Sequence, residues 1–155
     1  MPDPAPDTAG VLAPPPLVFG GALAAGLVLH AIAPLPLAPP PVRALGVPLA
    51  GAGVALVLAA VRSLRAARTA VEPWKPTTSI VVAGPYGRTR NPIYLAMALA
   101  YGGVTLATNA GWAALLLPPT LLAIRRGVID REERYLEARF GDEYRAYRAR
   151  VRRWL

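Results

Sequence analysis

Residues 91–124 read NPIYLAMALAYGGVTLATNAGWAALLLPPTLLAI, and this stretch decides the fold because its 34 residues include no charged side chain. About 20 helical residues cross a hydrocarbon core of about 30 Å. Asn109 divides the stretch into two apolar runs, 92–108 and 110–124. A soluble helical hairpin would present charges to water, so the stretch predicts a hairpin in a membrane. Both runs are short for a full crossing, which predicts little tilt or a locally thinned bilayer.

Two more apolar runs precede this stretch, at residues 17–37 and 44–61. The chain as a whole is 54% hydrophobic and 17% charged, whereas soluble domains carry about 25% charged residues. The sequence therefore predicts an all-α integral membrane protein with about four transmembrane helices. A disordered tail is expected over residues 1–16, and a single domain over residues 17–155.

Proline and small residues predict local features of these runs. Prolines at positions 34 and 36 are expected to end or kink the first helix near its far side, and residues 39–41 to form a stiff connector. Prolines 118 and 119 are expected to kink the fourth helix. Gly46, Ala50, Gly53 and Val57 recur three or four residues apart, which predicts close packing of the second helix against a neighbour.

Positive charge is concentrated in two polar segments, the loop 62–91 and the C-terminal segment 125–155. The loop has six basic residues against Glu72 alone, and the C-terminal segment has ten arginines against six acidic residues. Since basic loops face the cytoplasm, both segments and both termini are expected there. The net charge of +8 lies beside apolar spans, which favours membrane lipids rather than nucleic acid as the partner.

The C-terminal segment is expected to be helical. Leu136, Phe140, Tyr144, Tyr147 and Val151 recur at spacings of three and four, which is the apolar face of one helix, or of two helices broken near residue 141.

Several kinds of chemistry are excluded by composition. The chain has no cysteine, so disulfides and thiolate metal sites are impossible. His30 is the single histidine, which argues against a histidine metal site and a Ser-His-Asp arrangement, and no metal is expected. Since His30 lies within the first span, we expect it to bridge helices.

Polar residues gather where the third and fourth runs meet the cytoplasm. Residues 84–94, GPYGRTRNPIY, lead into the third run, and residues 131–134, REER, follow the fourth. A hairpin brings both segments to the same membrane face, where an arginine and a carboxylate pair can hold a zwitterionic ligand. The alternative is that these residues are interfacial anchors.

The residue identities in these segments favour a ligand site over interfacial anchors. Residues 75–78 (KPTT), 84–86 (GPY), 90–94 (RNPIY), 132–136 (EERYL) and 140–144 (FGDEY), with Tyr147, resemble the isoprenylcysteine carboxyl methyltransferase and phospholipid methyltransferase superfamily. The resemblance covers about half of the chain. Asn91 stands where many relatives have histidine, and Ala96 where many have glycine. Asparagine forms hydrogen bonds but does not act as an acid or base near neutral pH.

The resemblance implies an integral membrane methyltransferase of the bacterial inner membrane. Its implied cofactor is S-adenosylmethionine, and its implied acceptor is a lipophilic or membrane-associated molecule, either the carboxylate of a prenyl-cysteine-like molecule or a lipid amine. Arg90 and Glu133 are the implied catalytic residues, with Arg90 orienting an anionic acceptor. The implied cofactor-binding residues are Gly84, Tyr86, Asn91, Tyr94, Glu132, Glu133, Tyr144 and Tyr147.

Two rival interpretations stay open. The first is a non-catalytic membrane scaffold or assembly protein, which would bind no cofactor. The second is a small channel or transporter subunit, which is less favoured because the apolar runs contain few polar residues.

The distribution of arginine predicts the membrane topology. Reporter fusions placed after Leu155 and near Pro40 should report opposite sides of the membrane, with Leu155 in the cytoplasm. Fusions that report the same side would contradict the four-span arrangement.

Overall fold

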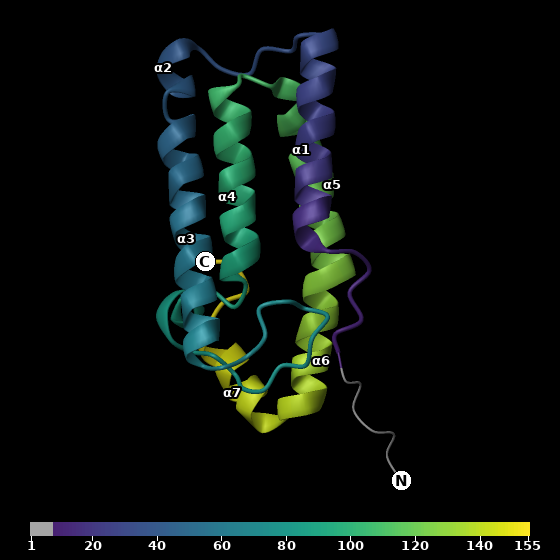
Figure 1. Cartoon of the computed structure of the whole chain (residues 1–155), viewed down its shortest axis with the longest axis vertical. Coiled ribbons are helices and arrows are strands. Elements are labelled where there is room, and N and C mark those ends of the chain that lie inside the picture. Colours follow the sequence, from purple (N-terminus) through teal and green to yellow (C-terminus); the bar gives the residue numbers. More distant parts are fainter. Residues whose placement is uncertain (1–7) are drawn as a thin grey trace.

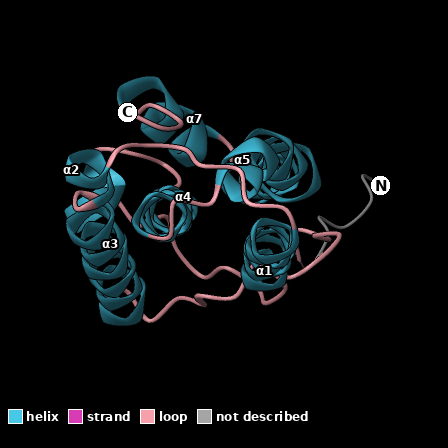
Figure 2. Cartoon of the chain, turned by 90° about the horizontal axis from the view of Figure 1, so that it is seen from above, coloured by secondary structure: helices cyan, strands magenta, loops and turns pink. Residues whose placement is uncertain are grey.

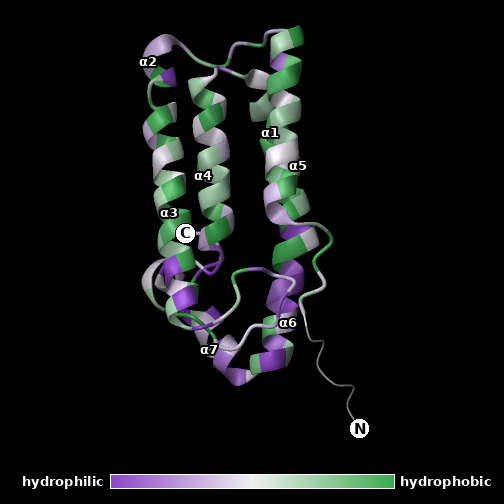
Figure 3. Cartoon of the chain, in the orientation of Figure 1, coloured by the Kyte–Doolittle hydropathy of each residue, from purple (hydrophilic) through white to green (hydrophobic). Residues whose placement is uncertain are grey.

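Four apolar helices run side by side in a computed structural model that describes residues 8–155 (Figures 1 and 2). They are α1 (Pro15–Ile32), α3 (Gly46–Ala66), α4 (Pro92–Ala107) and α5 (Gly111–Ile124). Three helical segments, Pro15–Ile32, Pro40–Ala66 and Gly111–Phe140, are long and apolar enough to cross a membrane, and α4 is apolar but only 16 residues long. Hydrophobic residues cover the bundle and hydrophilic residues gather at one end (Figure 3). The all-α membrane fold is thus confirmed.

The helices pack chiefly as two pairs, α3 with α4 and α1 with α5. The small residues of α3 explain the first pair: a Cβ atom added to Gly53 would lie 2.6 Å from the Ala100 nitrogen and 2.7 Å from the Ala96 oxygen. Gly46 approaches the backbone of α4 equally closely at Ala107. The expected small-residue packing is therefore confirmed. Although α4 and α5 are consecutive, α4 packs mainly on α3, because that is where the backbones can approach.

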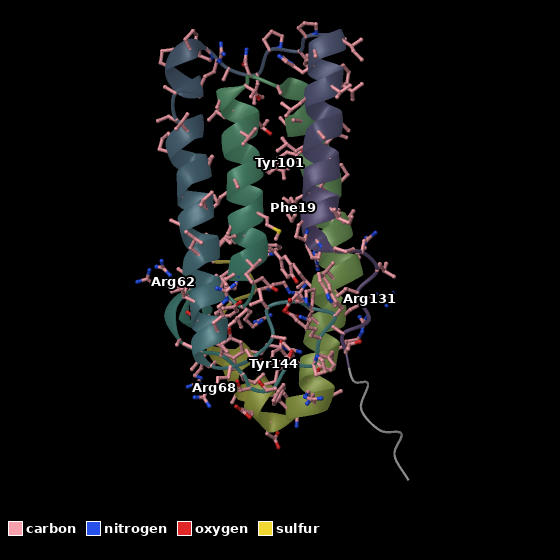
Figure 4. The ribbon with its side chains drawn as sticks, viewed as in Figure 1. Phe19, Arg62, Arg68, Tyr101, Arg131 and Tyr144 are labelled. Carbon is pink, nitrogen blue, oxygen red and sulfur yellow. The ribbon has the colours of Figure 1, made fainter. Side chains whose placement is uncertain are left out.

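Aromatic residues join the two pairs. Phe19 of α1 and Tyr101 of α4 point toward each other inside the bundle (Figure 4), with ring centroids 6.4 Å apart in an edge-on arrangement. The hydroxyl of Tyr101 donates a hydrogen bond of 2.8 Å to the carbonyl oxygen of Ala113 on α5. This bond satisfies a buried hydroxyl in surroundings where no water can do so.

The end of the bundle away from the polar residues is closed by backbone hydrogen bonds. Helix α1 ends at Ile32, two residues before Pro34, as expected. The side-chain oxygen of Asn109 accepts hydrogen bonds from the backbone N–H groups of Leu37 and Ala38. His30 does not bridge helices as expected: its Nδ1 atom accepts the N–H of Leu35 in the connector that follows its own helix.

One expectation for the proline-containing segments is wrong. The triple proline does not form an extended connector throughout, because Pro40–Arg43 form a short helix, α2, in which proline takes the first helical position. The fourth apolar run ends at Ile124, as expected, but the helical backbone continues beyond it. Helix α5 runs through prolines 118 and 119, continues as a π-helical turn, η2 (Arg125–Ile129), and joins α6 (Asp130–Phe140).

The continuous helix from Gly111 to Phe140 has 30 residues. At 1.5 Å per residue it is about 45 Å long, which exceeds a hydrocarbon core of about 30 Å. Its uncharged part ends at Ile124, before Arg125 and Arg126, and the polar turns of α6 therefore project beyond the membrane-spanning segment.

The C-terminal segment folds back from this projection. Gly141, with φ of 53°, separates α6 from α7 (Asp142–Arg150), which confirms the expected break. Tyr144, Tyr147 and Val151 are buried with Leu136 and Phe140 around them, so the expected apolar face is also confirmed.

The expectation of a disordered tail over residues 1–16 falls partly outside the described residues, which begin at residue 8. From there the chain packs along α6, where the Leu12 N–H donates to the Gly127 carbonyl and Arg131 donates to the Gly10 carbonyl. Helix α1 then begins at Pro15. Ordered chain thus begins earlier than the composition suggests.

The packing of α3 on α4 should depend on the side-chain volume at Gly53 and not at Gly51, which lies on another face of α3. Gly53→Leu places atoms into the α4 backbone, and we expect a loss of about 2 kcal/mol of stability. Gly51→Leu is the matched control, since a Cβ atom there meets nothing within 4 Å. Thermal unfolding in detergent measures both, and equal stability of the two variants would contradict the packing.

Candidate functional site

A pocket lies at the polar end of the bundle, between the loop 67–83, the short 3-10 helix η1 (Gly84–Gly87), the start of α4, and α6. Its empty volume is about 770 Å³, including the space at its open mouth. Hydrophobic walls with a few polar groups are typical of small-molecule sites. Its lining includes a buried carboxylate, an amide and several tyrosines, which makes this pocket the candidate site.

The structure brings most of the sequence-predicted site residues together. Those that line the pocket are Tyr86, Arg90, Asn91, Tyr94, Glu132 and Tyr147. Three others lie outside it. Gly84 lines a second, separate pocket, Tyr144 is buried in the aromatic cluster of the C-terminal segment (Figure 4), and Glu133 pairs with two arginines.

Glu132 presents a carboxylate to the pocket. Its Oε1 atom accepts a hydrogen bond of 2.8 Å from the hydroxyl of Tyr94, and no described residue donates to Oε2. Burial raises the pKa of Glu132 to about 7; the hydrogen bond from Tyr94 opposes this rise, and the nearby charge of Glu133 adds to it. The side chain therefore changes charge near neutral pH.

Glu133 lies in the opposite environment. Arg90 donates to Oε1 from Nη2 at 2.9 Å and from Nε at 3.3 Å, and Arg153 donates to both carboxylate oxygens. Only 11% of its side chain is exposed. Burial opposes ionisation, but the hydrogen bonds from Arg153 and Arg90 prevail and lower the pKa of Glu133 below its usual value. Glu133 therefore favours its ionised form and is held by two cations.

The different settings of the two glutamates follow from helix geometry. Successive residues of an α-helix point about 100° apart, so adjacent side chains can meet different surroundings. Glu132 lines the pocket, whereas Glu133 is turned toward Arg90 and Arg153.

Arg90 is fully engaged by its own chain. Besides Glu133, its guanidinium donates to the carbonyl oxygens of Val151 at 2.7 Å and Arg148 at 3.3 Å. Its backbone N–H donates to the Arg152 carbonyl. These contacts favour a structural role, and orientation of an anionic acceptor by Arg90 stays a prediction.

Residues 151–153, which we call the C-terminal strap, hold the start of α4. The carbonyl oxygen of Arg153 accepts from the Asn91 side-chain amide and from the Thr89 hydroxyl, each at 3.0 Å. The Arg153 guanidinium also pairs with Asp130 at 3.0 Å. Sequence reasoning missed Arg153 because its contacts lie 20 to 64 residues away.

The loop 67–83, which we call the lid loop, covers one side of the pocket. It is held by the Thr77 N–H, which donates to the Tyr135 hydroxyl at 3.0 Å, and by hydrogen bonds between Thr78 and the segment at Arg68 and Thr69. The hydroxyl of Ser79 lines the pocket, is buried, and has no partner among the described residues. Tyr135 and Ser79 were not among the sequence-predicted residues.

Two tyrosines form the wall between η1 and α7. The Tyr147 hydroxyl donates 2.8 Å to the Tyr86 carbonyl oxygen. Burial, with smaller effects of Glu132 and Tyr147, raises the pKa of Tyr86, so its phenol stays neutral and can donate a hydrogen bond.

Loss of the Arg90 side chain should destabilise the protein even without any ligand. Arg90→Met leaves Glu133 buried with fewer donors, and we expect a loss of about 3 kcal/mol. Arg88→Met should be nearly neutral, because Arg88 is exposed and its side chain forms no hydrogen bond or ion pair with the described residues. Thermal unfolding in detergent is the measurement, and similar stabilities would make Arg90 an ordinary surface charge.

Comparisons with known proteins place these features in a family. The family model described as phospholipid methyltransferase matches residues 42–143, which include α3, η1, α4, α5 and α6. An uncharacterized protein of Haemophilus influenzae is 46% identical over 50 residues, covering 32% of this chain and 76% of that protein. No solved structure matches the chain. Since the family model covers most of the bundle and of the pocket wall, the chain belongs to the phospholipid methyltransferase family.

Proposed function

We propose that this protein transfers a methyl group from S-adenosylmethionine to a lipophilic or membrane-associated acceptor. The observation that carries the proposal is the pocket at the polar end of the bundle, with the free Oε2 atom of Glu132 set between tyrosines. Membership of a methyltransferase family supports the reaction type. The site would lie in the cytoplasm next to the inner membrane of a bacterium, with both termini on that side.

The pocket suits the chemistry of this cofactor, which has an aromatic base, two ribose hydroxyls, an amino-acid end and a sulfonium. The carboxylate of Glu132 can accept hydrogen bonds from the ribose hydroxyls or from the ammonium group. The rings of Tyr86 and Tyr147 offer surfaces for the base or the sulfonium. The orphaned hydroxyl of Ser79 would gain a partner, which removes the cost of its burial.

When bound, the cofactor supplies an electrophilic methyl group, and the protein contributes position and exclusion of water. The lid loop, anchored on Tyr135, separates the pocket from solvent on one side. Tyr94 orients the carboxylate of Glu132 through its hydrogen bond. Asn91, held by the Arg153 carbonyl, forms part of the pocket floor at the start of α4.

Two classes of acceptor agree with this site. The carboxylate of a prenyl-cysteine-like molecule needs no general base, because it is already ionised. A lipid amine must first lose a proton, and Glu132 is the pocket carboxylate whose pKa, raised to about 7 mainly by burial, suits a base near neutral pH. Glu133 is less suited to that task, because two arginines hold its charge.

Glu132 is expected to contribute directly to cofactor affinity. Glu132→Gln should weaken binding of S-adenosylhomocysteine by about 1.5–3 kcal/mol, which is the range for hydrogen bonds to charged groups. Affinity of the unmodified protein should rise as pH rises through about 7, because the ionised carboxylate is the better acceptor. Calorimetry on detergent-purified protein measures both effects.

The matched control is Glu143→Gln on α7, since Glu143 is exposed and does not line the pocket. Absence of binding by the unmodified protein would overturn the proposal and favour a membrane scaffold. If the protein binds the cofactor, transfer of labelled methyl groups to membrane lipid extracts distinguishes the two classes of acceptor. A methyl ester is cleaved by base, and a methylated amine is not.

A further inference from the structure

The C-terminal strap contributes no methyl-transfer chemistry in the proposal above, yet it forms hydrogen bonds and ion pairs with several groups that support the site. Its backbone accepts hydrogen bonds from Arg90, Asn91 and Thr89. Its one partly buried arginine binds Asp130 and Glu133 on α6. The strap therefore joins the start of α4 to the start of α6, the two elements that bear the polar groups of the pocket.

We propose that Arg153 is a positioning residue for the cofactor site, which holds Glu133 away from the pocket so that Glu132 and Asn91 face it. The inference rests on the proposed function, because it concerns the binding of the same cofactor. Arg153 itself does not line the pocket, and it acts through the residues that it holds.

Arg153 is needed in addition to Arg90 because the charge of Glu133 opposes ionisation of Glu132. Glu132 and Glu133 are adjacent carboxylates, and each makes the other harder to ionise. Arg90 and Arg153 together supply hydrogen bonds to both oxygens of Glu133. With Arg153 present, the charge of Glu133 is well compensated, and Glu132 can ionise close to neutral pH.

The surroundings of Glu132 contain few other groups that can change this balance. The titratable and charged side chains that share the pocket with it are Glu72 from the lid loop, Tyr86 from η1, Arg90 and Tyr94 from the start of α4, Tyr135 from α6 and Tyr147 from α7. Burial raises the pKa values of Tyr86 and Tyr147, so these phenols stay neutral near pH 7. The carboxylate of Glu72 is paired with Lys75 at 2.8 Å. Arg90 and Arg153 therefore compensate the charge of Glu133, which influences the pKa of Glu132 beside burial and the hydrogen bond from Tyr94.

The test compares the pH dependence of S-adenosylhomocysteine binding among four variants, using calorimetry on the full-length protein in detergent. Arg153→Met should weaken binding and move the midpoint of its rise with pH upward, by roughly half a pH unit for the loss of one nearby charge. Glu133→Gln should move the midpoint downward, since it removes a negative charge and leaves two cations. Arg153→Lys should restore the midpoint while leaving affinity partly reduced, because lysine keeps the charge without the paired donors.

Arg152→Met is the matched control, because Arg152 neighbours Arg153 in the strap and has an exposed side chain that forms no hydrogen bond or ion pair with the described residues. It should behave as the unmodified protein. If Arg153→Met weakens binding with an unchanged midpoint, Arg153 is only a structural contact and the inference is wrong. If the unmodified protein does not bind at all, the proposed function fails instead.

Discussion

The polar end of this protein depends on the compensation of one buried carboxylate, that of Glu133. A buried charge without a partner would destabilise the folded protein by several kcal/mol. Two arginines from distant parts of the sequence, Arg90 and Arg153, form ion pairs with Glu133 and offset this cost. To deliver those arginines, the C-terminus must return to the start of α4, and α7 must turn back at Gly141. The closed end of the pocket is a consequence of that return.

The apolar bundle solves a separate problem, since burial of hydrophobic side chains gives no driving force between helices inside lipid. Close backbone approach takes its place, through glycine and alanine where α3 meets α4 and where α1 meets α5 at Gly26 and Ala113. The bundle thus fixes the separation of α4 and α6 at their polar ends. It thereby positions Tyr94 and Glu132 for the hydrogen bond that joins them.

Much of the fold could be predicted from the sequence, because the lipid bilayer restricts which residues its helices can contain. Uncharged runs predicted the four apolar helices. The buried face of the C-terminal segment was predicted by the three- and four-residue spacing of Leu136, Phe140, Tyr144, Tyr147 and Val151. The continuity of α5 with α6 was not predicted, since a change from apolar to polar residues marks a membrane surface and not the end of a helix. Short proline motifs were also misleading, as the helix at Pro40–Arg43 shows.

The candidate site was predicted less completely, for two physical reasons. Local motifs located Tyr86, Asn91, Tyr94 and Glu132, which do share a pocket. They could not reveal Arg153, whose partners lie far away along the chain, nor the hydroxyl of Ser79, which belongs to a loop without periodic pattern. The family model adds the reaction class but does not distinguish the acceptors discussed above.

The continuous helix from Gly111 to Phe140 extends from the membrane-spanning segment to the candidate site. Its apolar length must match the hydrocarbon thickness, and a mismatch is relieved by tilting the helix or deforming the bilayer. Because Glu132 is on the same continuous helix, a tilt of the apolar part displaces the carboxylate relative to Tyr94 and Asn91. The geometry of the pocket is thereby coupled to bilayer thickness, so that acyl-chain length becomes a physical variable of the site.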